Sequence, residues 1–389
     1  SLILILLLPA SVLAATEMTG AELMVVTDDA PLVGVDDTTV LIYAVLAHCE
    51  GDDSAWGRNM NFPSPDSGKL SCHEVNELWH QYFWLCQYYE LTLVRIGASD
   101  SWGTKVMHEA WRDHPASFGE VISSMLHEAA EHGVKVCLVL AGSQEYPLYA
   151  FGGWGSVLDT GSQAYGNYIQ YCDGVMAITD SCGESSALFS YDCWNEPDHL
   201  SVNEAYWHGD QLRFRNWART ISSALCPLNG AMVEMGTGGY TGPGGLWTTW
   251  GLSSFLNITG LTGFDACHLH YYASIEDEYL FSDPLNWSAY VGKPLHWGEL
   301  ARNDVYPLQR WTWFEGRLRE LGADAWCNMV LRSTPGYPFT STIPADEEPP
   351  SGDDGGNPPV DDGNTTAPVP PPDNDTSGNI HPVDPFRRV

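Results

Sequence analysis

The chain has 389 residues and a formal charge of −33 at neutral pH, from 50 acidic and only 17 basic side chains. This length can bury one large hydrophobic core or two ordinary ones. The charge argues against nucleic acid and anionic lipid surfaces as partners, because both would be repelled electrostatically.

The first 14 residues are an apolar run that ends in small side chains. Val12 and Ala14 suit a signal-peptidase site, and the run is short for a membrane span. We therefore predict a secretory signal over residues 1–14, with a retained membrane anchor as the alternative. No later segment is apolar for long enough to cross a bilayer. The mature chain is expected to be a secreted, extracellular monomer without a membrane span.

Ten cysteines and four N-glycosylation sequons are consistent with export. Two cysteine pairs lie in loop-like stretches and are expected to form disulfides: Cys49 with Cys72, and Cys172 with Cys182. No Cys-x-x-Cys pair occurs, which argues against a zinc ribbon or a thioredoxin-type site. The sequons begin at Asn257, Asn286, Asn364 and Asn374.

Short apolar runs alternate with longer amphipathic ones through most of the chain. The runs are continuously apolar, as strands covered on both faces must be. The predicted strands cover residues 40–48, 91–99, 134–142, 187–195, 231–236, 264–272, 293–300 and 324–331. The predicted helices include residues 75–90, 118–133, 203–225 and 307–322. The second and the fourth of these helices end on Gly133 and Gly322, as expected of a helix C-terminus.

This alternation predicts the α/β class and a single (β/α)₈ barrel, the TIM barrel, in a catalytic domain over residues 15–340. An open, doubly wound sheet is the alternative. It would normally have a glycine-rich phosphate-binding turn after its first strand, and residues 46–57 do not form one. Residues 341–389 are rich in Pro, Asp and Gly and are predicted to be a disordered linker. Such a spacer suggests a further C-terminal module, or a tail that reaches toward a cell surface.

Two carboxylates stand at the ends of predicted strands. Glu196 ends the fourth strand just before Pro197, and Glu299 ends the seventh. Active sites of (β/α)₈ barrels lie at the C-terminal ends of the strands, so these side chains are expected to face each other across the barrel mouth. Two carboxyl groups about 5–5.5 Å apart suit glycoside hydrolysis by double displacement with retention of configuration.

Three neighbouring residues fit the needs of this chemistry. Arg95 and Tyr272, late in the second and sixth predicted strands, can keep a nucleophilic carboxylate ionised. Asn195 precedes Glu196 and can hydrogen-bond the sugar 2-hydroxyl. Burial and a second carboxylate nearby would raise the pKa of the acid.

The order and spacing of these motifs resemble clan A of the glycoside hydrolases, and within it most closely glycoside hydrolase family 5, the cellulase and β-mannanase family. The resemblance spans residues 95–299. It is carried by Arg95 in LVRIG, Asn195-Glu196-Pro197 in CWNEP, His270-Tyr271-Tyr272 in HLHYY and Glu299 in HWGEL.

The resemblance implies a secreted endo-β-1,4-glycanase that acts on β-glucan or β-mannan without a cofactor or a metal. Glu196 would be the acid/base and Glu299 the nucleophile. The subsite of the reacting sugar would be lined by Asn195, Arg95, His270 and Tyr272. Family 5 cellulases commonly have a histidine near the end of strand three, which residues 136–147 lack, and Trp326 lies early in strand eight.

Other interpretations are open at this point. The enzyme alternatives are other clan A activities, β-xylosidase-like or exo-acting. An inactive carbohydrate-binding barrel would have no reason to keep both glutamates with their neighbours. The glutamates could also be structural carboxylates. His127 and His132 in HEAAEH are five residues apart, so the motif lacks the His-x-x-x-His spacing of zinc proteases. Possible sugar-stacking platforms are Trp102, Trp154, Trp247 and Trp250.

Overall fold

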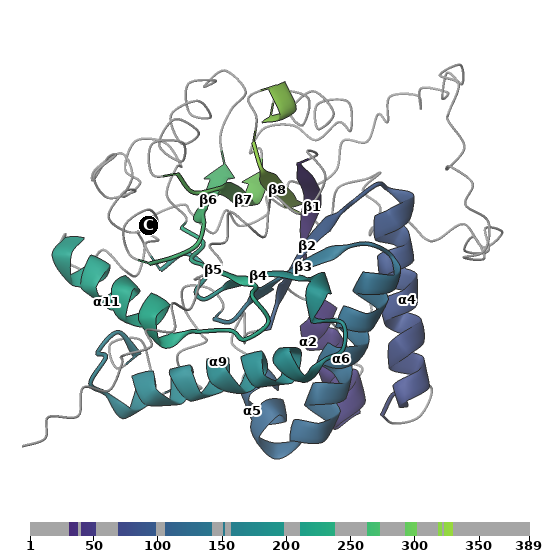
Figure 1. Cartoon of the computed structure of the whole chain (residues 1–389). Helices are drawn as coiled ribbons and strands as arrows, with labels where there is room; N and C mark the ends of the chain where they lie inside the picture. Colours follow the sequence, from purple (N-terminus) through teal and green to yellow (C-terminus); the bar gives the residue numbers. More distant parts are fainter. Residues whose placement is uncertain are drawn as a thin grey trace, which may run out of the picture. The chain divides into compact units, whose positions relative to one another are not determined.

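The computed structural model describes residues 31–37, 40–51, 69–98, 106–141, 151, 157–197, 211–237, 263–272, 292–301, 318–320 and 323–329. Eight parallel strands form one sheet in the order β5-β4-β3-β2-β1-β8-β7-β6 (Figure 1). The strands are β1 (Leu32–Asp37), β2 (Leu93–Gly97), β3 (Lys135–Val139), β4 (Leu188–Asp192), β5 (Met232–Glu234), β6 (Cys267–Tyr272), β7 (Leu295–Ala301) and β8 (Ala325–Met329).

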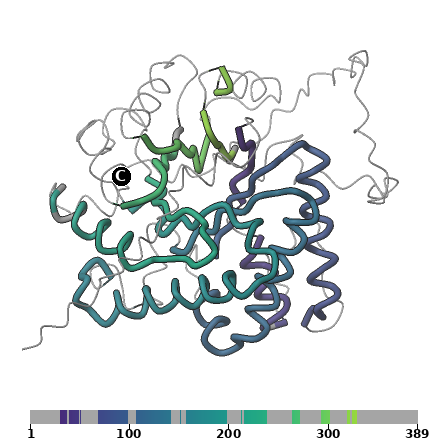
Figure 2. The backbone as a smooth tube through the Cα atoms, viewed as in Figure 1, coloured from purple at the N-terminus to yellow at the C-terminus, as the bar shows by residue number. Residues whose placement is uncertain are grey.

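The sheet curls on itself, because the first strand pairs with the last. Figure 2 shows β1 beside β8, and Gly34 is in register with Cys327. At the opposite side, β5 and β6 meet through a parallel bridge between Thr237 and Leu269. The His270 N–H donates to the Thr237 carbonyl there, at 2.8 Å. The predicted (β/α)₈ barrel is thus confirmed.

Helices cover the outside of the strands (Figure 1). Ser71 begins α4 with a reciprocal capping box, in which the Ser71 and Glu74 side chains bond each other's backbone N–H. Gly133 follows α6 in the left-handed conformation (φ 67°), as the sequence predicts. The helices are α2 (Val40–Val45), the π-helix η1 (Leu46–Glu50), α4 (Cys72–Tyr88), α5 (Val106–Asp113), α6 (Pro115–Glu131), α9 (Gln163–Ser181), the 3₁₀ helix η2 (Ser185–Ala187) and α11 (Gln211–Ala224).

The first predicted strand is wrong. Residues 40–48 form α2 and η1, while the strand precedes them as β1 in LVGVDD. Every residue of α2 is buried, and α2 contacts β2, α5 and α6. A helix that is buried on all sides carries the same continuous apolar run as a covered strand, so the periodicity does not distinguish them. Six of the other seven strands lie within their predicted segments, and β7 extends one residue beyond its segment, to Ala301.

The two predicted disulfides are also absent: all ten cysteines lie within the described residues and none is bridged. Cys172 is inside α9 and Cys182 caps its C-terminus. Ten residues of helix separate them by about 15 Å, far beyond the Cα spacing of a disulfide. Cys72 points its thiol to the Glu120 carboxylate at 3.6 Å.

Several predictions lie outside the described residues. None of the helices that the structure describes is long and apolar enough to span a membrane. The helix predicted over 307–322 is described only at residues 318–320. The predictions that fall outside are the signal (1–14), the linker (341–389), Gly322, the four sequons and the tryptophans Trp102, Trp154, Trp247 and Trp250.

Candidate active site

A single arginine gathers three carboxylates at the C-terminal ends of the strands. Arg95 of β2 is fully buried. Its guanidinium donates to Asp36 of β1 at 2.7 Å, to Asp192 of β4 at 2.6 Å and to Glu299 of β7 at 2.9 Å. It also donates to the Asn195 side-chain oxygen. Strands that are distant in sequence therefore share one cation, which fixes their ends relative to one another.

The turn after β4 holds Asn195 and Glu196 in place. The Asn195 N–H donates to the Ala141 carbonyl at 2.9 Å, and the Glu196 N–H donates to the Gly236 carbonyl at 2.7 Å. Glu196 has a left-handed backbone (φ 51°), which is uncommon for a residue with a side chain. Such strain persists only where the surroundings enforce it, and these two bonds do so.

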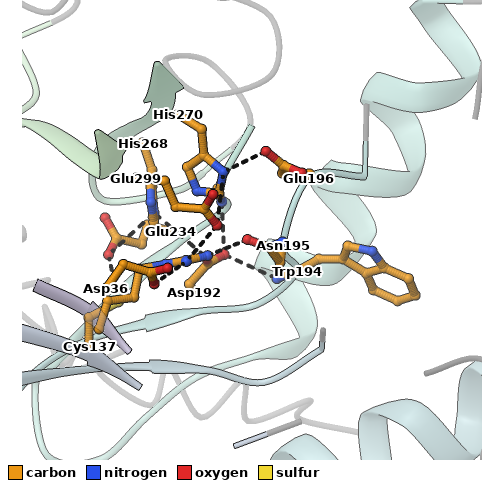
Figure 3. A network of polar contacts seen from close by, with 12 residues as sticks. Asp36, Cys137, Asp192, Trp194, Asn195, Glu196, Glu234, His268, His270 and Glu299 are labelled. Atoms are coloured by element: carbon orange, nitrogen blue, oxygen red, sulfur yellow. Dashed lines mark hydrogen bonds and ion pairs between the residues drawn. The ribbon is translucent and has the colours of Figure 1, made fainter. Parts of the chain in front are cut away.

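The imidazole of His270 lies between the two glutamates. Its Nδ1 is 2.9 Å from Glu196 Oε1 and 3.4 Å from Glu299 Oε1 (Figure 3). These three atoms all lie within 4.8 Å of one another. The residues are buried, at 0%, 7% and 5% exposure for His270, Glu196 and Glu299. The structure thus brings together the two strand-end carboxylates that the sequence pairs.

Gly236 makes this close approach possible. A Cβ atom at this position would lie 2.6 Å from Asp192 Oδ2 and 2.8 Å from His270 Nε2. The Gly236 N–H instead donates to Asp192 Oδ1 at 2.8 Å. A larger residue would therefore push apart the aspartate that holds Arg95 and the histidine that contacts the glutamates.

Charge is crowded in this site. Burial and the carboxylates of Glu196 and Asp36 raise the pKa of Glu299 well above its usual range, although Arg95 opposes the change. Burial likewise raises the pKa of Asp36 to about 6, against the attraction of Arg95. Burial alone would lower the pKa of Arg95, but the surrounding carboxylates raise it well above its usual value. The expected contact between Arg95 and Glu299 forms, but its attraction does not outweigh burial and neighbouring negative charge.

A second polar layer lies beneath these residues, inside the barrel. Its centre is Glu234 of β5, whose carboxylate accepts from Ser190 and, at 2.9 Å, from His296 Nδ1. His268 Nδ1 is 3.5 Å from the same carboxylate (Figure 3). Burial tends to raise the pKa of Glu234, but the two histidines and these hydrogen bonds lower it to about 2. Burial lowers the pKa of His268 well below its usual value.

Most of the predicted site residues come together. Arg95, Asn195, Glu196, His270 and Glu299 form one connected network. Tyr272 ends β6 in register with Ala301, and its side chain lies outside what the structure describes. Trp326 is fully buried in the hydrophobic core, so it does not form a platform at the site.

Sequence reasoning missed five residues of this region: Asp36, Asp192, Glu234, His268 and His296. One of them, His268, carried a usable signal, because residues two apart on a strand face the same side. His268 precedes His270 by two on β6, so it points into the barrel as well. Asp36 was missed because the first strand was predicted over residues 40–48, after the segment that forms β1.

Some groups in the barrel have the spacing of metal ligands. They are Glu196 with His270 and Glu299, Asp192 with His268 and His270, and Cys137 with Glu234 and His296. All three groups are buried inside the barrel, where Arg95 already neutralises Asp192 and Glu299, and two histidines already contact Glu234. The first group contains both strand-end glutamates, which a metal would withdraw from acid–base chemistry.

No protein-family model matches the sequence, and no curated protein does. Among solved structures, the fold is similar to the hyperthermostable endo-1,4-β-D-mannanase from Thermotoga petrophila RKU-1, with a TM-score of 0.53 and 14% identity over 77% of this chain and 88% of that one. A second structure, of the endo-β-1,4-mannanase from Thermotoga petrophila, has the same TM-score and identity over 78% and 68% of the two chains. At this identity the likeness shows the fold.

Proposed function

We propose that the protein is a retaining β-glycoside hydrolase, secreted and acting as an endo-β-1,4-glycanase on β-mannan or cellulose-like β-glucan. The observation that carries the proposal is the pair Glu196 and Glu299, whose oxygens approach within 4.8 Å on either side of His270. Inverting enzymes keep their carboxyl groups about 6.5–9.5 Å apart to admit a water, so the close pair supports retention.

The reaction then proceeds in two displacements. The Glu299 carboxylate attacks the anomeric carbon, while Glu196 donates its proton to the glycosidic oxygen of the departing sugar. This forms an α-linked glycosyl ester on Glu299. Glu196 next takes a proton from water, which attacks the same carbon and releases a sugar of β configuration.

The contacts in the site support this division of roles. Double displacement needs one proton on the pair, and close burial favours that state because two buried carboxylates repel each other. Arg95 donates to Glu299 at 2.9 Å, and its other contacts go to Asp36, Asp192 and Asn195. Arg95 is thus the cation that stabilises the Glu299 carboxylate, and we assign the transferred proton to Glu196, although burial and the neighbouring carboxylates raise the pKa of Glu299 in the free protein.

The substrate assignment draws on Asn195 and on the solved structures of similar fold. Asn195 is positioned by Arg95 and can accept or donate to a sugar hydroxyl beside the glutamates. The two solved structures of similar fold are named as endo-β-1,4-mannanases, which puts β-mannan first among the substrates to test. Other clan A activities and an inactive carbohydrate-binding barrel are the alternatives.

The first experiment assays the purified protein on soluble β-mannan, β-glucan and xylan, and on aryl β-glycosides. Hydrolysis of β-mannan or β-glucan with products of β configuration is expected. Cleavage of xylan alone, or only from chain ends, would favour another clan A activity. Absence of hydrolysis on every substrate would overturn the enzymatic proposal.

The second experiment separates the two glutamates. Glu196→Ala should slow cleavage of substrates with poor leaving groups on the order of 10²–10⁴-fold, and activated aryl glycosides far less, because these need little protonation. Azide should restore turnover and yield the β-glycosyl azide. Glu299→Ala should lose both substrate types, and azide should yield the α-azide. The opposite pair of azide products would show that the roles are reversed.

A further inference from the structure

Outside the barrel, two helices bring a group of metal-ligand side chains together. His80 of α4 and Glu128 of α6 face each other, with His80 Nδ1 3.1 Å from Glu128 Oε2. His132, which caps α6, places its Nε2 3.8 Å from the same oxygen and 3.3 Å from His80 Nδ1. The two helices lie side by side on the outside of the barrel (Figure 1). The group is separate from the proposed active site.

This group contains part of the HEAAEH motif, but not in the zinc-protease arrangement. His127 points elsewhere and lies 3.8 Å from Glu184. Glu128 and His132 are four residues apart and share one face, as the helical repeat requires. The third ligand comes from α4, 48 residues earlier. The spacing of histidines within the motif could not indicate a partner on another helix.

The three ligand atoms have the dimensions of a metal site. A zinc ion bound tetrahedrally at about 2.0–2.1 Å requires ligand atoms about 3.3–3.4 Å apart. The three distances here are 3.1, 3.3 and 3.8 Å. Two imidazoles and one carboxylate are ordinary ligands for zinc, and a fourth position would remain for water.

The protonation of His132 also suits a ligand. Its Nδ1 lies 3.0 Å from Gln87 Oε1, which can only accept a hydrogen bond. Nδ1 therefore carries the proton, and in the neutral ring Nε2 presents a lone pair to His80 and Glu128. A hydrogen bond from the far ring nitrogen is the usual support of a metal-binding histidine, because it fixes both the tautomer and the ring orientation.

One of the three ligands is accessible to solvent, and the other two are mostly buried. The His80 side chain is 41% exposed, while Glu128 and His132 are 14% and 10% exposed. An ion can enter beside His80, and the two less exposed ligands are held by a helix and its cap. An ion bound here would connect α4 to α6 directly.

We propose that His80, Glu128 and His132 bind one Zn²⁺ ion, which clamps α4 against α6 and stabilises the fold. The clamp is independent of the proposed glycosidase activity. Because the ion binds the native state and its ligands are dispersed in the unfolded chain, zinc raises the free energy of unfolding.

The test is titration of the metal-free full-length protein with ZnCl₂ by calorimetry, together with thermal unfolding with and without zinc. One equivalent should bind, and the Tm should rise. His80→Ala and His132→Ala should each abolish both effects, and Gln87→Leu should weaken binding about 10–100-fold. His127→Ala is the matched control, on the same helix and half exposed, and should bind zinc as the wild type does.

The Tm of the metal-free variants and their zinc binding together separate a loss of folding from a loss of the ion. The Tm of each metal-free variant shows whether it folds; His80→Ala removes a half-exposed side chain and should unfold close to the metal-free wild type. Saturable binding that persists in His80→Ala and His132→Ala would show that zinc occupies another group of the chain and would overturn the proposal. The proposal would also be overturned if the wild type did not bind zinc. A wild-type zinc affinity in Gln87→Leu, together with a wild-type Tm that zinc does not change, would overturn it as well.

Discussion

Replacing Arg95 with methionine tests whether the arginine holds the candidate active site together. Methionine has a similar length and can fill the same space without a charge. In the wild type, the carboxylates of Asp36, Asp192 and Glu299 lie 2.6–2.9 Å from the guanidinium. The substitution removes this shared cation. Removing one partner of a buried ion pair costs about 3–5 kcal/mol, and three carboxylates depend on this partner. We therefore expect Arg95→Met to lower the free energy of unfolding by about 4 kcal/mol at pH 7.

The loss should depend on pH in a defined direction. The pKa of Asp36 is already raised to about 6, and that of Glu299 is raised as well. Without Arg95 both rise further, so the native variant binds protons more tightly than its unfolded chain does. Stability is then gained as the pH falls through these raised values toward the unfolded value near 4. The difference between wild type and variant should shrink between pH 7 and pH 5.

Urea denaturation at pH 7 and pH 5, followed by tryptophan fluorescence, measures both effects. Arg112→Met is the control, because Arg112 pairs with Asp113 at 2.5 Å on the surface, with both side chains about half exposed. Its unfolding should not change measurably. A loss below about 1 kcal/mol for Arg95→Met at pH 7, typical of a surface pair, would refute the reasoning, as would an equal loss at both pH values.

Two further outcomes are expected from the barrel interior and the thiols. Glu234→Gln should destabilise the protein by about 3 kcal/mol at pH 7, because the pKa of this carboxyl is about 2 in the folded protein and 4.5 in the unfolded chain. That stabilisation is present above pH 4.5 and is lost as the pH falls toward 2. The denaturation curves of wild type and variant should therefore converge on acidification, and a constant difference between them would contradict the assignment. A thiol reagent should modify all ten cysteines in the denatured, unreduced protein, and fewer than ten reactive thiols would mean that disulfides form. In the native protein, Cys72 and Cys226 should react first, because they are exposed.

The sequence was sufficient for the two glutamates that close predicted strands, but it missed the strand carboxylates that pair with Arg95 and with the barrel histidines. Glu196 and Glu299 could be predicted to meet because a barrel directs every strand's C-terminal end to one rim. Glu234 also ends its strand, but that strand has only three residues, and its partner His296 lies 62 residues further on. Asp36 was missed because a buried helix was interpreted as the first strand.

The predicted disulfides fail for a different reason. Spacing along the chain suggested Cys172 with Cys182, but a straight helix between them holds them apart. A loop of ten residues would allow the bridge, whereas a helix of the same number does not. The pairing therefore depended on the local structure of the segment, which had not been recognised as a helix.

The way the barrel closes has a mechanical consequence for the two glutamates. Between β4 and β7 the circuit of strands can be followed through β3, β2, β1 and β8, where every neighbouring pair is joined by a parallel ladder, with register shifts in the β3–β4 and β7–β8 pairs. The shorter arc, through β5 and β6, crosses a seam that, among the described residues, is paired by the bridge between Thr237 and Leu269. Glu196 is bonded to the end of one side of this seam, and His270 lies on the other. A small widening of the seam would lengthen the contact between Glu196 and His270 first, while Arg95 keeps Glu299 attached to the laddered arc. The spacing of the carboxyl pair thus depends on the seam between β5 and β6, because Glu196 is bonded to Gly236 on one side of it and His270 lies on the other.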